Sequence, residues 1–296
     1  MAASVPRAAR RCFRQRVGHG YPQTMDPIEF FGLEQHGELR WQFDVAPRLA
    51  TAGKFLFGGC GLGAAITALE ASVGRRVVWA SAQYLAFAGL GERCEAHIDI
   101  VTSGHYTTQA RLTCRADGRE IFFVVASLGE RPNVHEGQWE QCPTVPPPQE
   151  CLERTSRWDM SNTVMETLDV RLARGLQWEE LGSAPGVTHG QSALWLKPHD
   201  LAVDTASLAI MGDYVPFGIS QALSQWTHVN SLDNTLRMIR HVPTEWVLLD
   251  VRIHGVRNGF GHGLVHLWSQ DGTLMATASQ SAVVRSGEIT VPPARG

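Results

Sequence analysis

Two polar side chains in the second half of the sequence have the chemistry needed to hold and activate a water molecule. Asp233 stands in the turn-like segment 231–234, and partial burial can raise the pKa of a carboxylate so that it accepts a proton near neutral pH. A turn or a cap at the start of a strand explains such an Asp equally well. Gln280 lies between Ala278 and Ala282, where an amide must be hydrogen-bonded to offset its desolvation. It can orient a water, bond to sheet backbone or point to solvent.

Histidines supply further candidates. His254 alternates with Val251 and Ile253 near the end of a predicted strand, and an imidazole there can exchange a proton near neutral pH or serve only structure. His262 and His266 stand four residues apart and face the same side of a strand. They make a weak metal pair, so we expect no metal and no organic cofactor.

A run of small residues, Gly58-Gly59-Cys60-Gly61, precedes the first predicted helix. Backbone N–H groups at a helix N-terminus attract a developing negative charge, and glycines let a substrate oxygen approach them. Close packing of the helix on a sheet is the competing explanation. Cys60 is expected to be a buried thiol and not a nucleophile. The Phe217-Gly218 pair is the predicted counterpart of this run in the second half.

The elements that must position these residues occur in the same order in two halves. Residues 57–74 have apolar side chains at helical spacing, with alanines around them, which predicts a buried helix. Strand-like runs follow, two of them joined by Asp117-Gly118, a hairpin signal. In the second half, residues 207–226 hold a helix opened by Asp213 and Pro216, and the hairpin signal recurs at Asp271-Gly272. These signals lie 154 residues apart (271 − 117) and indicate an internal duplication.

We therefore expect an α+β fold: a tandem pair of units, each a curved antiparallel sheet around a central helix. The expected boundaries are a leader over 1–24, domains over 25–133 and 161–287, a Pro-rich linker over 134–160 and a tail over 288–296. The leader has five arginines and no acid. An upstream start codon or a disordered segment explains it better than a transit peptide does.

Composition excludes several classes of protein. The formal net charge is −3 and the sequence has 44% hydrophobic residues, which disfavours a nucleic-acid binder and a disordered chain. No apolar run is long enough to span a bilayer. The six cysteines show no CxxC pair and are expected to be reduced. A soluble, cytoplasmic protein is expected.

The motifs resemble those of the acyl-CoA thioesterase II-like double-hotdog proteins, in the thioesterase-like superfamily. In the first half the similar segments are Phe57-Gly58-Gly59, residues 81–85 and residues 115–127. In the second half they are residues 231–235, 259–263 and 269–280. The similarity extends from about residue 27 to residue 285, and the second-half motifs together are fairly specific.

The resemblance implies that the protein hydrolyses an acyl-CoA to a free acid and coenzyme A. Members of this family use an Asp, a Ser or Thr and a Gln from the C-terminal hotdog to hold a water. By position the Asp falls on Asp233, the Gln on Gln280 and the hydroxyl on or near His254. Gly58, Gly59, Cys60 and Gly61 are then expected to bind the substrate.

Two alternatives remain open at this stage. A non-catalytic protein that binds acyl-CoA or an acyl carrier is favoured by the missing hydroxyl at position 254. A hotdog hydratase or dehydratase would need an Asp and a His a few residues apart before a helix, and no such pair is found. The oligomeric state is open, although pairing of identical chains through exposed sheets is a possible arrangement.

Overall fold

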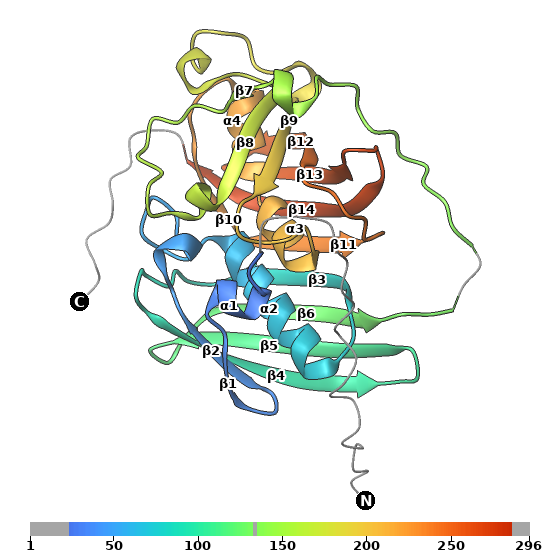
Figure 1. Cartoon of the computed structure of the whole chain (residues 1–296). Coiled ribbons are helices and arrows are strands. Elements are labelled where there is room, and N and C mark those ends of the chain that lie inside the picture. Colours follow the sequence, from blue (N-terminus) through green and yellow to red (C-terminus); the bar gives the residue numbers. More distant parts are fainter. Residues whose placement is uncertain (1–23, 133–134, 286–296) are drawn as a thin grey trace, which may run out of the picture.

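The computed structural model of the protein describes residues 24–132 and 135–285. Their strands form one antiparallel sheet, in the order β1-β2-β4-β5-β6-β3-β11-β14-β13-β12-β9-β8-β7, with β10 paired to β14. Figure 1 shows the two halves of the chain one above the other, with the longest helix against the sheet of the first half. Apart from residue 24, the predicted leader lies outside the described residues, and so does the tail.

The first half contains one long helix and six strands. Its helices are α1 (Pro27–Phe31) and α2 (Gly58–Val73), and its strands are β1 (Glu34–Gly37), β2 (Arg40–Asp44), β3 (Val77–Tyr84), β4 (Arg93–Ser103), β5 (Thr107–Ala116) and β6 (Arg119–Gly129). Helix α2 is buried from Gly59 to Leu69, as its lack of a polar face predicts. Asp117 and Gly118 both have positive φ between β5 and β6, as the tight hairpin requires.

The second half repeats this order with its central helix divided in two. Its strands are β7 (Leu152–Glu153), β8 (Leu168–Arg174), β9 (Gln191–Pro198), β10 (His228–Ser231), β11 (Asp233–Met238), β12 (Val247–Arg257), β13 (Phe260–Ser269) and β14 (Leu274–Arg285). The helices are α3 (Thr205–Met211) and α4 (Val215–Leu223). Pro216 lies in the first turn of α4, as expected for a proline at a helix start. Asp213 lies between the two helices and its side chain does not cap α4.

A repeat of 154 residues relates the two halves. Ser81 pairs with Val125 in the first half, and Thr235 pairs with Ser279 at the corresponding place in the second. Strands β3 and β11 also pair with each other, and the Ser81 and Thr235 hydroxyl oxygens lie 2.7 Å apart. In the helices the spacing differs, since α2 begins at Gly58 and the first helix of the second half, α3, begins at Thr205. Phe217 and Gly218, the predicted counterparts of the glycine run, lie near the start of the second of these helices, α4.

The central helices approach closely because small residues face each other. A Cβ added to Gly59 would lie 2.9 Å from the Ala209 carbonyl oxygen, and one added to Gly63 would lie 3.0 Å from that of Ala206. Helix α3 thus packs directly against the backbone of α2. This contact brings the N-terminus of α2 beside the α3–α4 junction.

The segment between the halves covers the far side of the second half of the sheet. Trp195, Leu248 and Trp268 form a separate apolar cluster there, while their strand neighbours face the main core. The Trp195 indole N–H donates to the Pro146 carbonyl oxygen at 2.9 Å. The five cysteines in the described ranges form no disulfide.

Candidate active site

One buried carboxylate joins the two halves of the protein. Asp213 lies between α3 and α4, and its Oδ2 accepts a hydrogen bond from the Gly59 N–H at 2.7 Å. Its Oδ1 accepts a short hydrogen bond from the side-chain amide of Gln280 and a longer one, 3.4 Å, from the Ser231 hydroxyl. The Gln280 amide also donates to the Ser231 oxygen at 3.1 Å. We call Asp213, Ser231 and Gln280 the polar cluster.

The orientation of Gln280 is fixed from its other end. Its side-chain carbonyl oxygen accepts a hydrogen bond from the Val215 N–H at 3.1 Å, at the first residue of α4. The side-chain nitrogen must therefore point toward Asp213 and Ser231. Gln280 thus satisfies the expectation that a buried amide on an apolar strand is hydrogen-bonded.

The electrostatics of Asp213 combine two opposing effects. Burial raises the pKa of the Asp213 carboxyl, and the hydrogen bonds from Gln280, Gly59 and Ser231 partly offset that rise. Such an environment makes a carboxylate a better proton acceptor than one in water. Asp213 is therefore the candidate general base of this site.

The N-terminus of α2 supplies open hydrogen-bond donors beside this carboxylate. The Gly59 N–H is used by Asp213 and the Gly61 N–H by the Phe57 carbonyl. Within the described ranges, no acceptor is recorded for the N–H groups of Gly58 and Cys60. Helix N-termini carry a partial positive charge, so negative charge that develops here is stabilised.

Two of the predicted site residues, Asp233 and His254, make no side-chain hydrogen bond to this cluster in the described residues. Asp233 accepts a hydrogen bond from the Ser281 N–H at 2.7 Å, and the carboxylate that meets Gly59 and Gln280 is that of Asp213. His254 is exposed at an irregularity of β12, because the bulge turns it out of the sheet. A hydroxyl that the sequence analysis did not single out, that of Ser231, lies in the cluster.

The glycine-rich run divides into residues at the polar cluster and residues that only pack. A Cβ added to Gly58 would lie 2.7 Å from the Asp213 Oδ2, whereas one added to Gly61 would meet the Phe122 ring at 3.2 Å. Burial, and next the charge of Asp213, raise the pKa of the Cys60 thiol. A thiol in that state is a poor nucleophile, as the sequence suggested.

The side chains of the polar cluster have no polar equivalents in the first half of the chain. The positions 154 residues before Asp213, Ser231 and Gln280 hold Gly59, Val77 and Ala126. None of these three side chains can accept a proton or hold a water. The repeat therefore provides one complete polar cluster, built on the second half and completed by the α2 terminus of the first.

Two cavities meet at Asp213. One has a volume of about 290 Å³ and lies between α4 and the segment 154–165. The other, of about 400 Å³, lies between α2 and the ends of β3 and β10. Asp213, Pro216 and Val229 line both. A molecule whose reactive carbon lay at Asp213 would extend one arm into each cavity.

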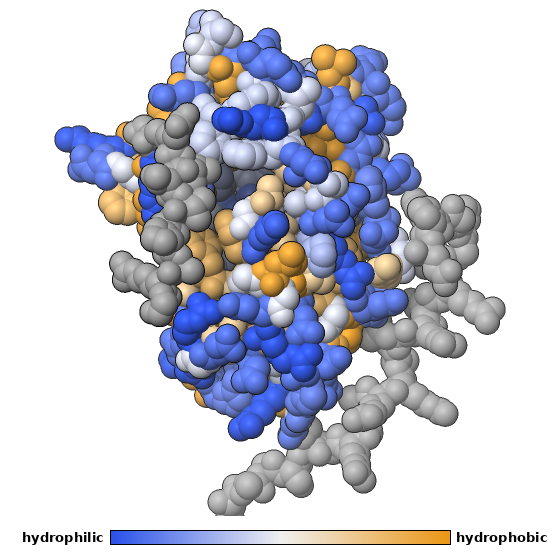
Figure 2. Space-filling view, turned by 90° about the vertical axis from the view of Figure 1, so that its left-hand side faces the viewer, coloured by the Kyte–Doolittle hydropathy of each residue, from blue (hydrophilic) through white to orange (hydrophobic). Residues whose placement is uncertain are grey.

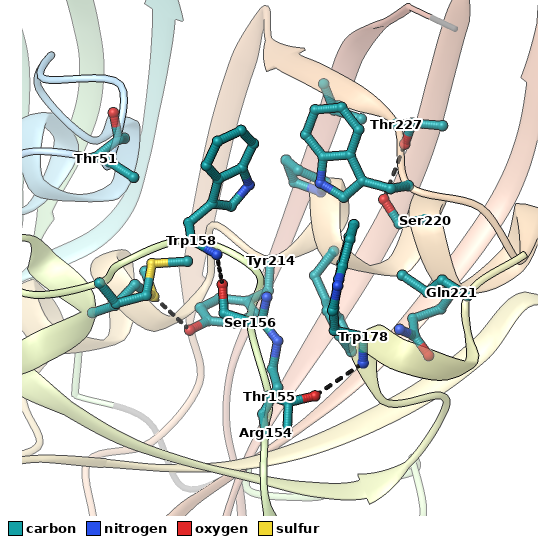
Figure 3. Close-up of a pocket in the computed structure, with 18 of the residues that line it drawn as sticks. Thr51, Arg154, Thr155, Ser156, Trp158, Trp178, Tyr214, Ser220, Gln221 and Thr227 are labelled. Carbon is teal, nitrogen blue, oxygen red and sulfur yellow. Dashed lines mark hydrogen bonds between the residues drawn. The ribbon is translucent and has the colours of Figure 1, made fainter. Parts of the chain in front are cut away.

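Aromatic side chains form one wall of the smaller cavity, which Figure 3 shows with Trp158, Trp178 and Tyr214 around it. The Arg157 guanidinium lies 4.9 Å from the Trp158 ring centre and 5.2 Å from that of Trp178, so it holds the segment around it against the aromatic wall. On the face in Figure 2, hydrophobic residues gather near the middle of a mainly hydrophilic surface. In the described residues, no group of three His, Cys, Asp or Glu is placed to hold a metal ion.

Comparison with known proteins places this architecture in the hotdog class. A hotdog-fold protein of Alicyclobacillus acidocaldarius superposes with a TM-score of 0.78 at 20% identity, over 88% of this chain and 98% of that one. Acyl-CoA thioesterase II TesB2 of Mycobacterium marinum superposes with a TM-score of 0.70 at 22% identity, over 89% and 99%. These likenesses establish the predicted double-hotdog fold.

A nearer relative and a family model define the family. A thioesterase candidate of Novosphingobium aromaticivorans is 33% identical, with a TM-score of 0.77 over 86% of this chain and 98% of that one. The family model of the acyl-CoA thioesterase C-terminal domain matches residues 140–284. The chain belongs to the acyl-CoA thioesterase II-like double-hotdog family. A search of curated proteins found no match. Among the described residues, no helix is long and apolar enough to cross a membrane.

Proposed function

We propose that the protein hydrolyses an acyl-CoA thioester through a water activated by Asp213. The observation that supports this most strongly is the convergence of a buried carboxylate, a hydroxyl and a fixed amide at the N-terminus of α2. Membership of the thioesterase family supports the reaction class. The two cavities that meet at Asp213 suit a substrate with an arm on each side of its carbonyl group.

The proposed reaction has two steps. Asp213 removes a proton from a water held by Ser231 and Gln280, and the water oxygen bonds to the thioester carbon as the carbonyl electrons move to oxygen. The carbon–sulfur bond of the tetrahedral intermediate then breaks as the C=O bond re-forms. The proton held by Asp213 passes to the departing sulfur, so one thioester and one water give one acid and one thiol.

Two features of the cluster fit these steps. The hydrogen bonds from Gly59 and Gln280 keep Asp213 fixed, which avoids the cost of orienting a base during reaction. Gly58 lines the larger cavity, so its open N–H can serve as a fixed donor to the charge that develops on the carbonyl oxygen, where such a donor is most effective. Arg154 lines one cavity and Arg285 the other, so each offers a cation for a substrate that carries phosphates.

The test is release of free thiol from acetyl-CoA, hexanoyl-CoA and palmitoyl-CoA by the wild type, Asp213→Asn and Asp233→Asn. The amide introduced by Asp213→Asn can still accept a hydrogen bond but cannot take a proton, so kcat should fall by about 10²- to 10⁴-fold. The amide introduced by Asp233→Asn can still accept from the Ser281 N–H, and this matched variant should retain wild-type turnover.

The results separate the possible outcomes. Equal turnover by the wild type and Asp213→Asn would remove Asp213 as the base. A large loss in Asp233→Asn with none in Asp213→Asn would restore the role that the sequence suggested for Asp233. Tight binding of all three acyl-CoAs without turnover would identify a binding protein.

A further inference from the structure

A buried tyrosine hydroxyl beside the polar cluster has no hydrogen-bond partner. The Tyr84 hydroxyl is shielded from solvent and makes no hydrogen bond of normal geometry with a described residue, although the Asn234 side chain lies near enough to lower the pKa of the phenol. A buried polar group left unpaired costs about 1–3 kcal/mol. A protein that retains such a group at an active site has a donor available for a ligand.

Distances from Gly58 show that this hydroxyl lies near the Asp213 carboxylate. A Cβ added to Gly58 would lie 2.7 Å from the Asp213 Oδ2 and 3.0 Å from the Tyr84 hydroxyl oxygen. The two oxygens are therefore at most 5.7 Å apart (2.7 plus 3.0). Both oxygens therefore lie close to the same side of Gly58. Tyr84, Gly58 and Asp213 also line the larger cavity together.

The ring that carries this hydroxyl is held by its surroundings. Tyr84 is the last residue of β3, paired with Phe122, and the two rings pack edge to face with centres 6.3 Å apart. Its backbone N–H donates to the Leu232 carbonyl at 2.9 Å. Burial, and next the charge of Asp213, raise the pKa of Tyr84, so the phenol keeps its proton and remains a donor.

We propose that Tyr84 is a catalytic residue whose hydroxyl donates to the carbonyl oxygen of the thioester and to the oxyanion formed from it. This inference rests on the proposed hydrolysis and adds a side-chain donor to the open Gly58 N–H. The two donors approach the carbonyl oxygen while Asp213 directs the water to the carbonyl carbon. Asn234, buried with both side-chain amide atoms unpaired, is the competing partner for the hydroxyl.

The first test is Tyr84→Phe, with Tyr106→Phe as the matched control. Loss of one donor to an oxyanion lowers kcat by about 10²- to 10³-fold, and KM should stay near the wild-type value. Because the hydroxyl is unpaired, thermal stability should stay equal or rise. Tyr106 is an exposed tyrosine beside Arg131, and its variant should behave as the wild type. Unchanged kcat, or a lowered melting temperature that indicates a structural bond to Asn234, would overturn the proposal.

The second test does not need turnover. The probe is the ketone analogue of octanoyl-CoA, in which CH₂ replaces the thioester sulfur, and its carbonyl stretching band is measured by infrared spectroscopy. The band should lie at lower frequency on the wild type than on Tyr84→Phe, and the analogue should bind the variant about 2- to 12-fold more weakly, as for loss of one hydrogen bond.

The outcomes separate the two proposals. An identical band and affinity in both proteins would reject the role of Tyr84 even if hydrolysis proceeds. A band shift without hydrolysis of any acyl-CoA would support the donor and reject the thioesterase reaction. Absence of both binding and hydrolysis would reject both.

Discussion

A methyl group at Gly58 is the smallest change that should disturb Asp213 without removing it. The Cβ of Gly58→Ala would lie 2.7 Å from the Asp213 Oδ2, whereas ordinary contacts begin at 3.4 Å. The overlaps of about 0.7 Å with Asp213 (3.4 − 2.7) and about 0.4 Å with the Tyr84 hydroxyl (3.4 − 3.0) must be relieved by shifts of these two side chains, because the backbone of α2 is packed against α3. A displacement of about 1 Å at a reacting group costs about 10²-fold in rate. We therefore expect kcat to fall by about that factor.

The fold should tolerate this change. Alanine is favoured over glycine in a helix by about 1 kcal/mol, and overpacking costs about 1–3 kcal/mol, so the free energy of unfolding should fall by at most about 2 kcal/mol. Thiol release gives kcat, and chemical denaturation gives the free energy of unfolding.

The matched control for Gly58→Ala is Gly255→Ala, where an added Cβ would meet nothing within 4 Å. The control should match the wild type in both assays. A kcat for Gly58→Ala within about threefold of the wild type would refute the argument that a fixed Asp213 position limits the rate.

Three further predictions concern the polar cluster. Burial raises the pKa of Asp213 above the usual 3.8. A plot of kcat/KM from pH 4 to pH 8 should therefore fall on the acid side with a midpoint above 3.8. A flat profile down to pH 4 would contradict the role of Asp213 as the base. Gln280→Ala removes a hydrogen bond that lowers this pKa, so the acid limb should move to higher pH while kcat falls; an unmoved limb would show that Gln280 does not act on Asp213. His254→Ala should leave kcat and the pH profile of kcat/KM unchanged, because this side chain is exposed outside the cluster. A large loss of kcat in this variant would show that His254 takes part in the reaction.

The periodic spacing of apolar residues and the turn motifs were sufficient to predict the fold. The buried helix near residues 57–74 and the Asp117-Gly118 hairpin follow from local pattern, since apolar spacing and turn chemistry act over a few residues. The division of the second central helix was missed. The sequence pattern assigns Asp213 and Pro216 to one helix start, whereas in the structure Asp213 accepts a hydrogen bond from Gly59 of the other half.

The candidate site could be predicted only in part, because its contacts are long-range. Gln280 and the Gly58-Gly59 pair were identified by the cost of a buried amide and by glycines at a helix start. Predicting Asp213 and Ser231 would have required the register between the two halves, and local residue spacing does not provide that register.

The most direct test of the central claim is a single turnover of acyl-CoA in H₂¹⁸O. If Asp213 activates a water, the product acid formed in that first turnover contains one ¹⁸O atom, and the peptide that contains Asp213 contains none. Unlabelled acid together with ¹⁸O in the Asp213 carboxyl group would show that this residue attacks the thioester itself, and would contradict the account.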